Sequence, residues 1–258
     1  MLLTIDVGNT NIVFGLYDSE ILIKKWRMGV SDKTSDEMGL FICSLFNYND
    51  IDKSNLKGII ISSVVPSIMY SLTNGILKYF NIEPIVVNYS MNLGNVFKNS
   101  DRAGLGSDRI VNCIAAYEFF KSAAIIIDYG TATTYDAIDK NGGFITGLTA
   151  PGIKIAAEAL FSRAALLGKV ELNLPSSIFV KNTAESVQAG ILYSAIGETE
   201  YIVNKMRIEI GEPNAKIIAT GGLVHTISGG TQIFDHIVPS LTLDGLRILY
   251  KMNNRWII

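Results

Sequence analysis

The chain has 258 residues, of which 48% are hydrophobic, and a formal net charge of −2 at pH 7. This length and apolar content allow a large buried core, in one large domain or two medium ones, which excludes a disordered protein. The slightly acidic balance, with a sequence pI near 5.7, disfavours nucleic acid as the main partner and favours small ligands or other proteins.

Turn residues separate three apolar runs at the start of the chain, which predicts an antiparallel meander of strands. Two helices are expected after it, one capped by Ser35 or Asp36 and the other with Pro66 in its first turn. Two further short runs rich in β-branched residues predict strands. This order of elements indicates a mixed sheet with covering helices. The predicted strands are residues 2–5, 12–17, 21–28, 58–65 and 84–88.

The opening pattern then occurs a second time. The segment AAIIIDYGTATTYDAID, residues 123–139, repeats the strand, aspartate, glycine turn and second strand of LLTIDVGNTNIVFGLYD at residues 2–18. The repeat predicts two similar halves packed face to face. We expect domains of 1–118 and 119–258, with the boundary near residues 115–122. The later elements are a predicted strand at 142–150, helices at 153–167 and 183–210, and a strand at 216–220.

Both repeats contain an Asp-x-Gly turn followed by small polar residues, beginning at Asp6 and at Asp128. Glycine lets the backbone turn its N–H groups toward a ligand, and Asn and Thr add donors, so such a turn can cradle a phosphate without a lysine. The aspartate can hold a cation beside that phosphate. One copy alone is more typical of an ordinary hairpin. Two copies in matching context favour a nucleoside triphosphate held from both sides.

A third glycine turn, Gly221-Gly222, follows the predicted strand 216–220. Open α/β sheets admit ligands at such strand ends, although a plain strand-to-helix turn fits equally well. The common nucleotide signatures are missing. The chain has no G-x-x-x-x-G-K-[ST] sequence, and GLGSDR at 104–109 lacks the third glycine of a dinucleotide fingerprint. Phosphate must therefore be bound on another scaffold.

The only two cysteines, Cys43 and Cys113, lie in apolar stretches that predict helices, and we interpret them as buried apolar side chains that permit a reducing compartment. The first apolar run has no basic segment before it and is interrupted by Asp6, which argues against a signal peptide or membrane span. We expect a cytoplasmic protein with no membrane partner.

Five segments, in order and spanning essentially the whole chain, resemble the motifs of the type III pantothenate kinases. They are DVGNTN (6–11), GSDRIVN (106–112), DYGTATT (128–134), KNT (181–183) and ATGGL (219–223). The resemblance implies an α/β fold of two similar ribonuclease H-like domains of the actin-like ATPase type, each a mixed five-stranded sheet with covering helices. It also implies transfer of the ATP γ-phosphoryl group to the 4′-hydroxyl of pantothenate, the first step of coenzyme A biosynthesis.

The resemblance assigns further partners and roles. It implies Mg²⁺ with ATP, a monovalent cation (K⁺ or NH₄⁺), and a homodimer with the active site near its interface. Asp108 follows a glycine-rich loop, heads a predicted helix and matches the catalytic aspartate of the family; a helix N-cap is its alternative role. Arg109 is expected to bind the pantothenate carboxylate, with a surface position as the alternative. Thr183 is expected to contact substrate, with a helix cap as the alternative.

The remaining expected site residues follow the same motifs. Asp128 is expected to hold the monovalent cation, and Asp6 to hold Mg²⁺ directly or through water. The expected ATP-binding residues are Asp6, Gly8, Asn9, Thr10, Asn11, Gly130, Thr131, Gly221 and Gly222. The expected substrate-binding residues are Phe97, Gly106, Ser107, Asp108, Arg109 and Thr183.

One segment departs from the family pattern. In FKNSDRAGLGSDR, Phe97 stands where a tyrosine is usual, Ser100 replaces a proline, and about two extra residues precede Gly106; Ser107 replaces a more usual alanine. A hydroxyl contact to substrate is then missing, so a kinase of the same superfamily for another small hydroxylated acid or sugar is an alternative. A second alternative is a nucleotide-binding regulator without turnover. The presence of Asp108 together with both phosphate turns argues against the regulator.

Overall fold

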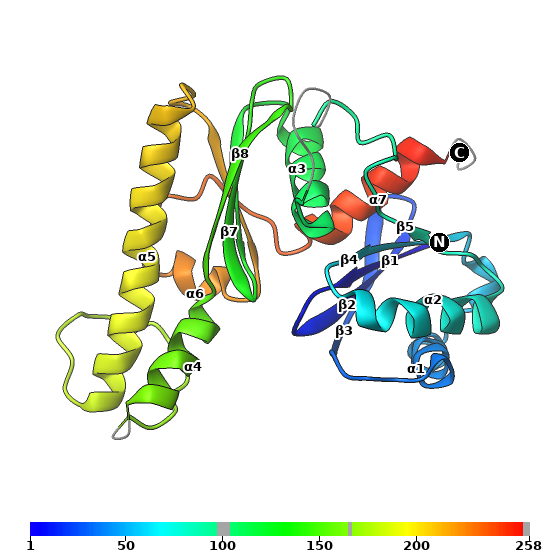
Figure 1. The fold of residues 1–258 in the computed structure, drawn as a ribbon, viewed down its shortest axis with the longest axis horizontal. Coiled ribbons are helices and arrows are strands. Elements are labelled where there is room, and N and C mark those ends of the chain that lie inside the picture. The colour runs from blue at the N-terminus through cyan, green and yellow to red at the C-terminus, as the bar shows by residue number, and fades with distance from the viewer. Residues whose placement is uncertain (97–103, 165–166, 255–258) are drawn as a thin grey trace. The chain divides into compact units, whose positions relative to one another are not determined.

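The computed structural model describes residues 1–96, 104–164 and 167–254 (Figure 1). The described residues divide into two compact units, one of 1–94, 104–115 and 242–254, the other of 95–96, 116–164 and 167–241. Each unit contains one five-stranded mixed sheet with helices packed on it. The predicted pair of mixed five-stranded sheets is confirmed.

The sheet of the first unit has the order β3-β2-β1-β4-β5. The first three strands pair antiparallel, and β4 and β5 continue the sheet in parallel to β1. The helices α1 and α2 lie together, and the buried aliphatic side chains of the sheet pack against them. The bounds are β1 Leu2–Val7, β2 Asn11–Asp18, β3 Ile21–Gly29, α1 Ser35–Tyr48, the short 3₁₀ helix η1 Lys53–Asn55, β4 Gly58–Ser63, α2 Pro66–Phe80 and β5 Ile85–Val86.

The helix α1 begins one residue earlier than its predicted caps allow. Thr34 is the N-cap: its Oγ1 accepts the Glu37 N–H at 3.2 Å, and the Glu37 carboxylate accepts the Thr34 N–H at 2.8 Å. The prediction of Ser35 or Asp36 as the cap is therefore wrong. The reciprocal capping box fixes the start, because Thr34 has an extended backbone and Glu37 lies three residues later.

The sheet of the second unit has the order β10-β9-β6-β7-β8. Its first three strands in sequence form an antiparallel meander, and β9 and β10 extend it in parallel, which repeats the arrangement of the first unit. The bounds are β6 Ala124–Tyr129, β7 Ala132–Ile138, β8 Phe144–Pro151, α4 Ile153–Arg163, α5 Thr183–Glu209, β9 Lys216–Gly221, α6 Val224–Ser228 and β10 His236–Ile237. The helix predicted over 153–167 thus ends at Arg163.

The expected domains 1–118 and 119–258 differ from the two observed units at two helices. In α3 (Ser107–Phe120), the residues up to Ala115 group with the first unit and those from Ala116 with the second. In α7 (Leu241–Asn253), the residues from Thr242 onward group with the first unit. There the Thr242 hydroxyl donates to Asn112 Oδ1 at 2.8 Å. The C-terminal helix therefore completes the packing of the N-terminal unit.

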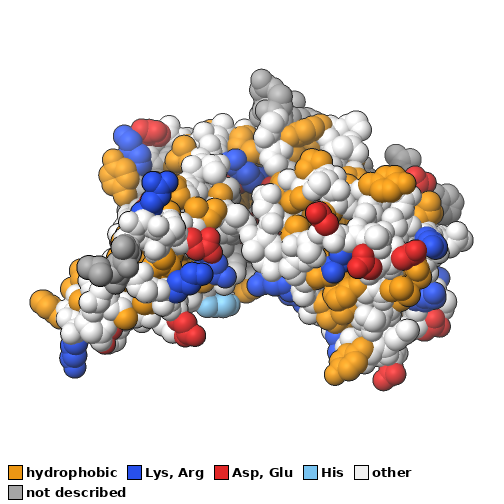
Figure 2. Space-filling model, turned by 60° about the horizontal axis from the view of Figure 1, so that its bottom comes forward, with side chains coloured by type: hydrophobic (Ala, Val, Ile, Leu, Met, Phe, Trp, Pro, Cys, Tyr) orange, Lys and Arg blue, Asp and Glu red, His pale blue; other side chains and the backbone are white. Residues whose placement is uncertain are grey.

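On the face shown in Figure 2, acidic and basic side chains of the described residues are interspersed rather than gathered in one patch. No helix in the part of the chain that the structure describes is long and apolar enough to cross a membrane.

Candidate active site

The first predicted phosphate turn connects β1 to β2. Asp6 lies half-buried near the end of β1, while Asn9 and Thr10 are exposed at the tip. The Gly8 N–H donates to the Asn11 carbonyl at 3.0 Å and closes the turn. A side chain at Gly8 would place its Cβ 3.3 Å from that same carbonyl oxygen, which is tighter than ordinary van der Waals contact. Any larger residue would push that carbonyl away by a few tenths of an ångström, so glycine favours a compact turn that presents polar groups to solvent.

Two serines at the end of β4 connect this turn to the substrate motif. Asp6 and Ser62 are register partners in the parallel pairing of β1 and β4. The Ser107 hydroxyl lies 3.0 Å from the Ser62 hydroxyl, accepts the Ser63 N–H at 2.9 Å and donates to the Ser63 carbonyl at 3.0 Å. The first turn of α3 is thereby fixed to the strand that neighbours Asp6. Ser62 and Ser63 were not predicted as site residues; polar residues ending an otherwise apolar strand were the available signal.

Asp108 occupies the first turn of α3. Its Oδ1 accepts the Arg109 N–H at 2.8 Å, and burial raises the pKa of its carboxyl, while that hydrogen bond and the charge of Arg109 oppose the rise. A side chain at Gly106 would collide with the Asp108 carboxylate in its present position, so any larger residue there would displace that carboxylate. A carboxylate with a raised pKa is a better proton acceptor, as a general base requires.

The second predicted phosphate turn connects β6 to β7. Asp128 is half-buried near the end of β6, and Gly130 and Thr131 are exposed. The Gly130 N–H donates to the Ala132 carbonyl at 3.1 Å, which closes this turn as Gly8 closes the first. The structure thus places the second pair of Asp and Gly in the same structural context as the first.

The Gly221-Gly222 turn lies directly against the second phosphate turn. Strand β9 is parallel to β6, with Gly221 opposite Tyr129, and the Gly222 N–H donates to the Tyr129 carbonyl at 3.1 Å. Gly221 has a φ of +98°, and a Cβ there would lie 2.5 Å from the Tyr129 nitrogen and 2.6 Å from Asp128 Oδ1. Only glycine combines this backbone conformation with so close an approach. The predicted cation, phosphate and adenosine residues of this unit are therefore brought together.

Thr183 is exposed at the first position of α5. The N-cap is Asn182, whose Oδ1 accepts the Glu185 N–H at 2.9 Å, so the alternative in which Thr183 caps the helix is wrong. Its hydroxyl lies at the end of a helix whose N-terminal partial charge favours anionic or polar ligands. Phe97 lies outside the described residues.

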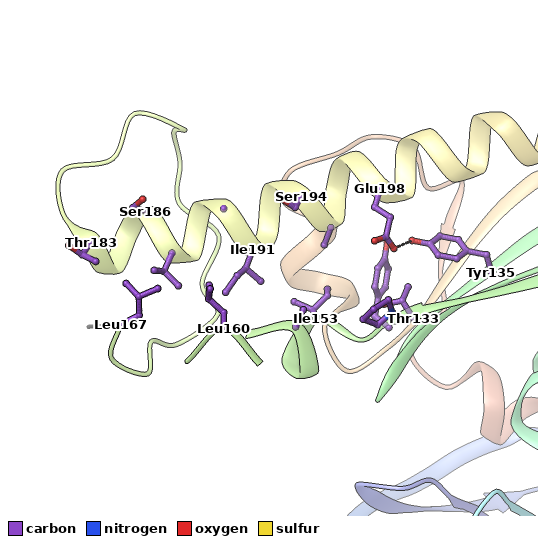
Figure 3. Close-up of a pocket in the computed structure, with 16 residues that line it drawn as sticks. Thr133, Tyr135, Ile153, Leu160, Leu167, Thr183, Ser186, Ile191, Ser194 and Glu198 are labelled. Carbon is purple, nitrogen blue, oxygen red and sulfur yellow. Dashed lines mark hydrogen bonds between the residues drawn. The ribbon is translucent and has the colours of Figure 1, made fainter. Parts of the chain in front are cut away.

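A cavity of about 710 Å³ extends along α5 in the second unit (Figure 3). Thr183 lies at one end and Glu198 at the other, and side chains of β7 and α4 line the sides. Most lining residues are apolar. The lining includes Thr133, Tyr135, Ile153, Leu160, Ile191 and Ser194.

Oxygen atoms are the metal ligands that the two turns offer. Within the described residues, no group of three or more His, Cys, Asp or Glu side chains is placed to hold a metal ion. Asp6 nevertheless lies in the same turn as Asn9 and Thr10, and these side chains offer carboxylate, amide and hydroxyl oxygens. Such hard oxygen donors fit Mg²⁺, which commonly takes one or two carboxylates together with substrate phosphates.

A family model described as type III pantothenate kinase matches residues 2–205. The chain belongs to the type III pantothenate kinase family. It is 44% identical over 256 residues to a type III pantothenate kinase of Agathobacter rectalis, covering 99% of this chain and 98% of the relative. The predicted family is confirmed, and pantothenate kinase is the enzyme that this membership assigns.

Solved structures support the fold. A Campylobacter jejuni protein named as a putative Baf family transcriptional activator aligns with a TM-score of 0.56 and 18% identity, covering 97% of this chain and 98% of that one. An activator of 2-hydroxyisocaproyl-CoA dehydratase from Clostridium difficile aligns with a TM-score of 0.55 and 13% identity, covering 95% and 91%. At these identities the likeness concerns the fold, and the predicted two-domain α/β architecture with a mixed five-stranded sheet in each unit is confirmed.

Proposed function

We propose that this pantothenate kinase uses Asp108 as the general base and the two Asp-x-Gly turns to bind the phosphates of ATP. The observation that carries this proposal is the Ser62–Ser107–Ser63 hydrogen bonding, which fixes Asp108 on α3 beside the strand end that bears Asp6. A base for the attacking hydroxyl and a phosphate-binding turn are thus held on one rigid frame. Kinase chemistry needs both within reach of the transferred group.

In the proposed reaction, the pantothenate hydroxyl oxygen attacks the γ-phosphorus while its proton passes to the Asp108 carboxylate. The bond between the γ-phosphorus and the β–γ bridging oxygen breaks, and that oxygen leaves with ADP. The Asp108 pKa, raised by burial, favours acceptance of the proton. Arg109, the next residue, offers a planar fork of donors that fits the pantothenate carboxylate bidentately.

In this proposal the phosphates are bound by the Asn and Thr side chains of the turns, while the Gly8 and Gly130 N–H groups close the turns and these glycines let the phosphates approach the backbone. Gly8, Asn9, Thr10 and Asn11 act in the first unit. In the second unit, Thr131 binds phosphate next to Gly130, and the Gly221-Gly222 turn binds the adenosine side of the nucleotide. Asp6 would hold the Mg²⁺ that accompanies ATP, and this ion would supply charge neutralisation at the phosphates.

We further propose that Asp128 holds a monovalent cation and that the chain acts as a homodimer to which Thr183 contributes. The half-buried Asp128 carboxylate beside Gly221 supports the cation, since a charge at such a position gains from a counterion. The exposed position of Thr183 at the head of α5 supports contact with a ligand or second chain.

The proposal is tested with purified protein by coupling ADP formation to an optical readout. Turnover should require pantothenate, increase with K⁺ over Na⁺, and fall by about a hundredfold or more in Asp108→Asn, which is the size of general-base catalysis. Asp52→Asn, an exposed aspartate that caps η1, serves as the matched control and should retain full turnover. Wild-type turnover without pantothenate dependence, or an unimpaired Asp108→Asn, would contradict the proposal.

The departure at Phe97 and Ser100 favours testing one alternative, a kinase for another small hydroxylated acid or sugar. The same assay with a panel of sugars and hydroxy acids separates the two functions. A kcat/KM for any of them above that for pantothenate would reassign the substrate while leaving the phosphoryl-transfer residues in place.

A further inference from the structure

Three buried hydroxyl groups meet behind the second phosphate turn. Tyr129 ends β6, Tyr135 lies on β7, and Thr199 faces both from α5. The Thr199 hydroxyl lies 2.8 Å from the Tyr129 hydroxyl and 3.2 Å from that of Tyr135. Tyr129 is 2% exposed, and the other two are 0% exposed. We call these three residues the hydroxyl cluster; no sequence motif indicated it.

The hydrogen bonds of the hydroxyl cluster have a single consistent direction. Tyr135 donates to Glu198 Oε1 at 3.1 Å (Figure 3). Because each hydroxyl has one proton, Thr199 must then donate to Tyr135, and Tyr129 must donate to Thr199. Burial raises the pKa of both tyrosines, so both stay protonated at any physiological pH. The result is a directed chain from Tyr129 to a carboxylate on α5.

Tyr129 also connects the two nucleotide turns through its backbone. It lies between Asp128 and Gly130, so its position determines where the second phosphate turn begins. Its carbonyl accepts the Gly222 N–H at 3.1 Å, and Gly221 lies against its nitrogen. The residue therefore contacts the phosphate turn, the glycine turn and α5 at once.

We propose that Tyr129 is a positioning residue for ATP, and that its bond to Thr199 fixes both nucleotide turns relative to α5. This inference rests on the proposed function of those turns. Packing alone does not require the hydroxyl, since phenylalanine fills the same space, and a buried hydroxyl is costly unless it is hydrogen-bonded. Its specific effect is to fix the distance from the turns to a 27-residue helix.

The test compares Tyr129→Phe with wild type in calorimetric titration with a non-hydrolysable ATP analogue and Mg²⁺. Tyr129→Phe removes the buried hydrogen bond between Tyr129 and Thr199, which should raise the analogue Kd about three- to tenfold. Thr199→Val should do the same, Thr199→Ser should restore wild-type Kd, and the double variant Tyr129→Phe/Thr199→Val should be no worse than either single one. In the kinase assay, KM for ATP should rise while KM for pantothenate stays constant.

Tyr17→Phe is the matched control. Tyr17 is a fully buried tyrosine of the first unit whose hydroxyl donates to Asp244 Oδ1 at 2.9 Å. Its variant should lower the melting temperature as Tyr129→Phe does but leave the analogue Kd unchanged. Equal Kd values for Tyr129→Phe and wild type, with a lowered melting temperature, would reduce the cluster to a structural role and overturn the inference.

Two further outcomes are distinguishable. If Tyr129→Phe does not fold, Thr199→Val decides, because valine replaces only the threonine hydroxyl, by a methyl group, and an analogue Kd equal to that of the wild type would then overturn the inference. If the wild type binds the analogue without phosphorylating pantothenate, the proposed function fails while the Kd values still decide the role of Tyr129.

Discussion

Ser107 is hydrogen-bonded in both directions to the backbone of Ser63, accepting its N–H at 2.9 Å and donating to its carbonyl at 3.0 Å. A side chain on the first turn of a helix thus takes the place of a strand partner at the end of β4. These bonds attach the first turn of α3, which carries Asp108, to the end of β4.

Ser107→Ala should lower the free energy of unfolding by about 1 to 2 kcal/mol, because the Ser63 N–H loses its partner in a partly buried position. Activity should fall less than about tenfold, since the packing of α3 still holds Asp108 near its place. Urea unfolding and steady-state kinetics measure the two effects. Ser54→Ala, which removes an exposed serine bonded to Asp52, should change stability by less than about 0.5 kcal/mol. A hundredfold loss of activity in Ser107→Ala would instead place its hydroxyl in the chemistry.

Asp108→Asn should unfold at a higher temperature than wild type at pH 7, although its turnover is expected to fall about a hundredfold or more. Burial raises the folded-state pKa of this carboxyl above its unfolded value near 3.8, so at pH 7 the ionised group opposes folding. The free-energy cost of burying the ionised carboxylate decreases as the pH falls through the folded-state pKa of Asp108, and it is absent below the unfolded-state pKa. At that low pH, wild type and Asp108→Asn should be equally stable. Thermal unfolding from pH 7 to pH 3 measures this.

Asp52→Asn is the control for that experiment, because the pKa of Asp52 is shifted down rather than up and the expected change in stability has the opposite sign. Hydrogen bonds from Ser54 lower the pKa of Asp52, so its ionised form favours folding above the unfolded pKa. Its variant should be less stable than wild type at pH 7 and equal to it at low pH. A lower melting temperature of Asp108→Asn at pH 7 would show that the carboxylate is stabilising in place.

Arg109→Lys should raise KM for pantothenate by about tenfold or more and leave KM for ATP within about twofold. Lysine keeps the charge but loses the planar fork that binds a carboxylate with two parallel hydrogen bonds. A pantothenate analogue with an alcohol in place of the carboxylate tests the contact directly, because wild type and variant should use it equally well. An equal loss with both substrates would assign Arg109 a role other than carboxylate recognition.

The repeat of strand, aspartate and glycine turn was enough to predict two similar mixed sheets. It sufficed because alternating β-branched runs and glycine turns are local features that determine strands and hairpins directly. The five-stranded order β3-β2-β1-β4-β5 and its counterpart in the second unit confirm that prediction. The same local patterns correctly anticipated a buried strand leading into each predicted turn.

Helix caps and long-range contacts were harder to predict. Thr34 and Asn182 are the caps, rather than the neighbours considered from sequence, because the cap is the residue that adopts extended backbone. The contact of Tyr129 with Thr199 joins residues 70 positions apart. No local periodicity encodes such a pair, since it depends on how α5 packs on the sheet.

Gly221→Ala tests the adenosine turn most directly. An alanine at this position would have to adopt a φ of +98°, and its Cβ would lie 2.5 Å from the Tyr129 nitrogen. The turn must therefore shift away from β6. We expect a Kd for a non-hydrolysable ATP analogue at least about tenfold weaker, together with a lower melting temperature.

Gly197→Ala is the matched control for that substitution. Gly197 is exposed on α5, and no atom lies within 4 Å of the position that an alanine Cβ would take. Alanine there should raise stability by about 0.5 to 1 kcal/mol and leave analogue binding unchanged. If Gly221→Ala binds the analogue as wild type does while Gly197→Ala behaves as expected, the Gly221-Gly222 turn is not part of the ATP site. Adenosine recognition must then come from other residues, and Tyr129 would position the phosphate turn alone.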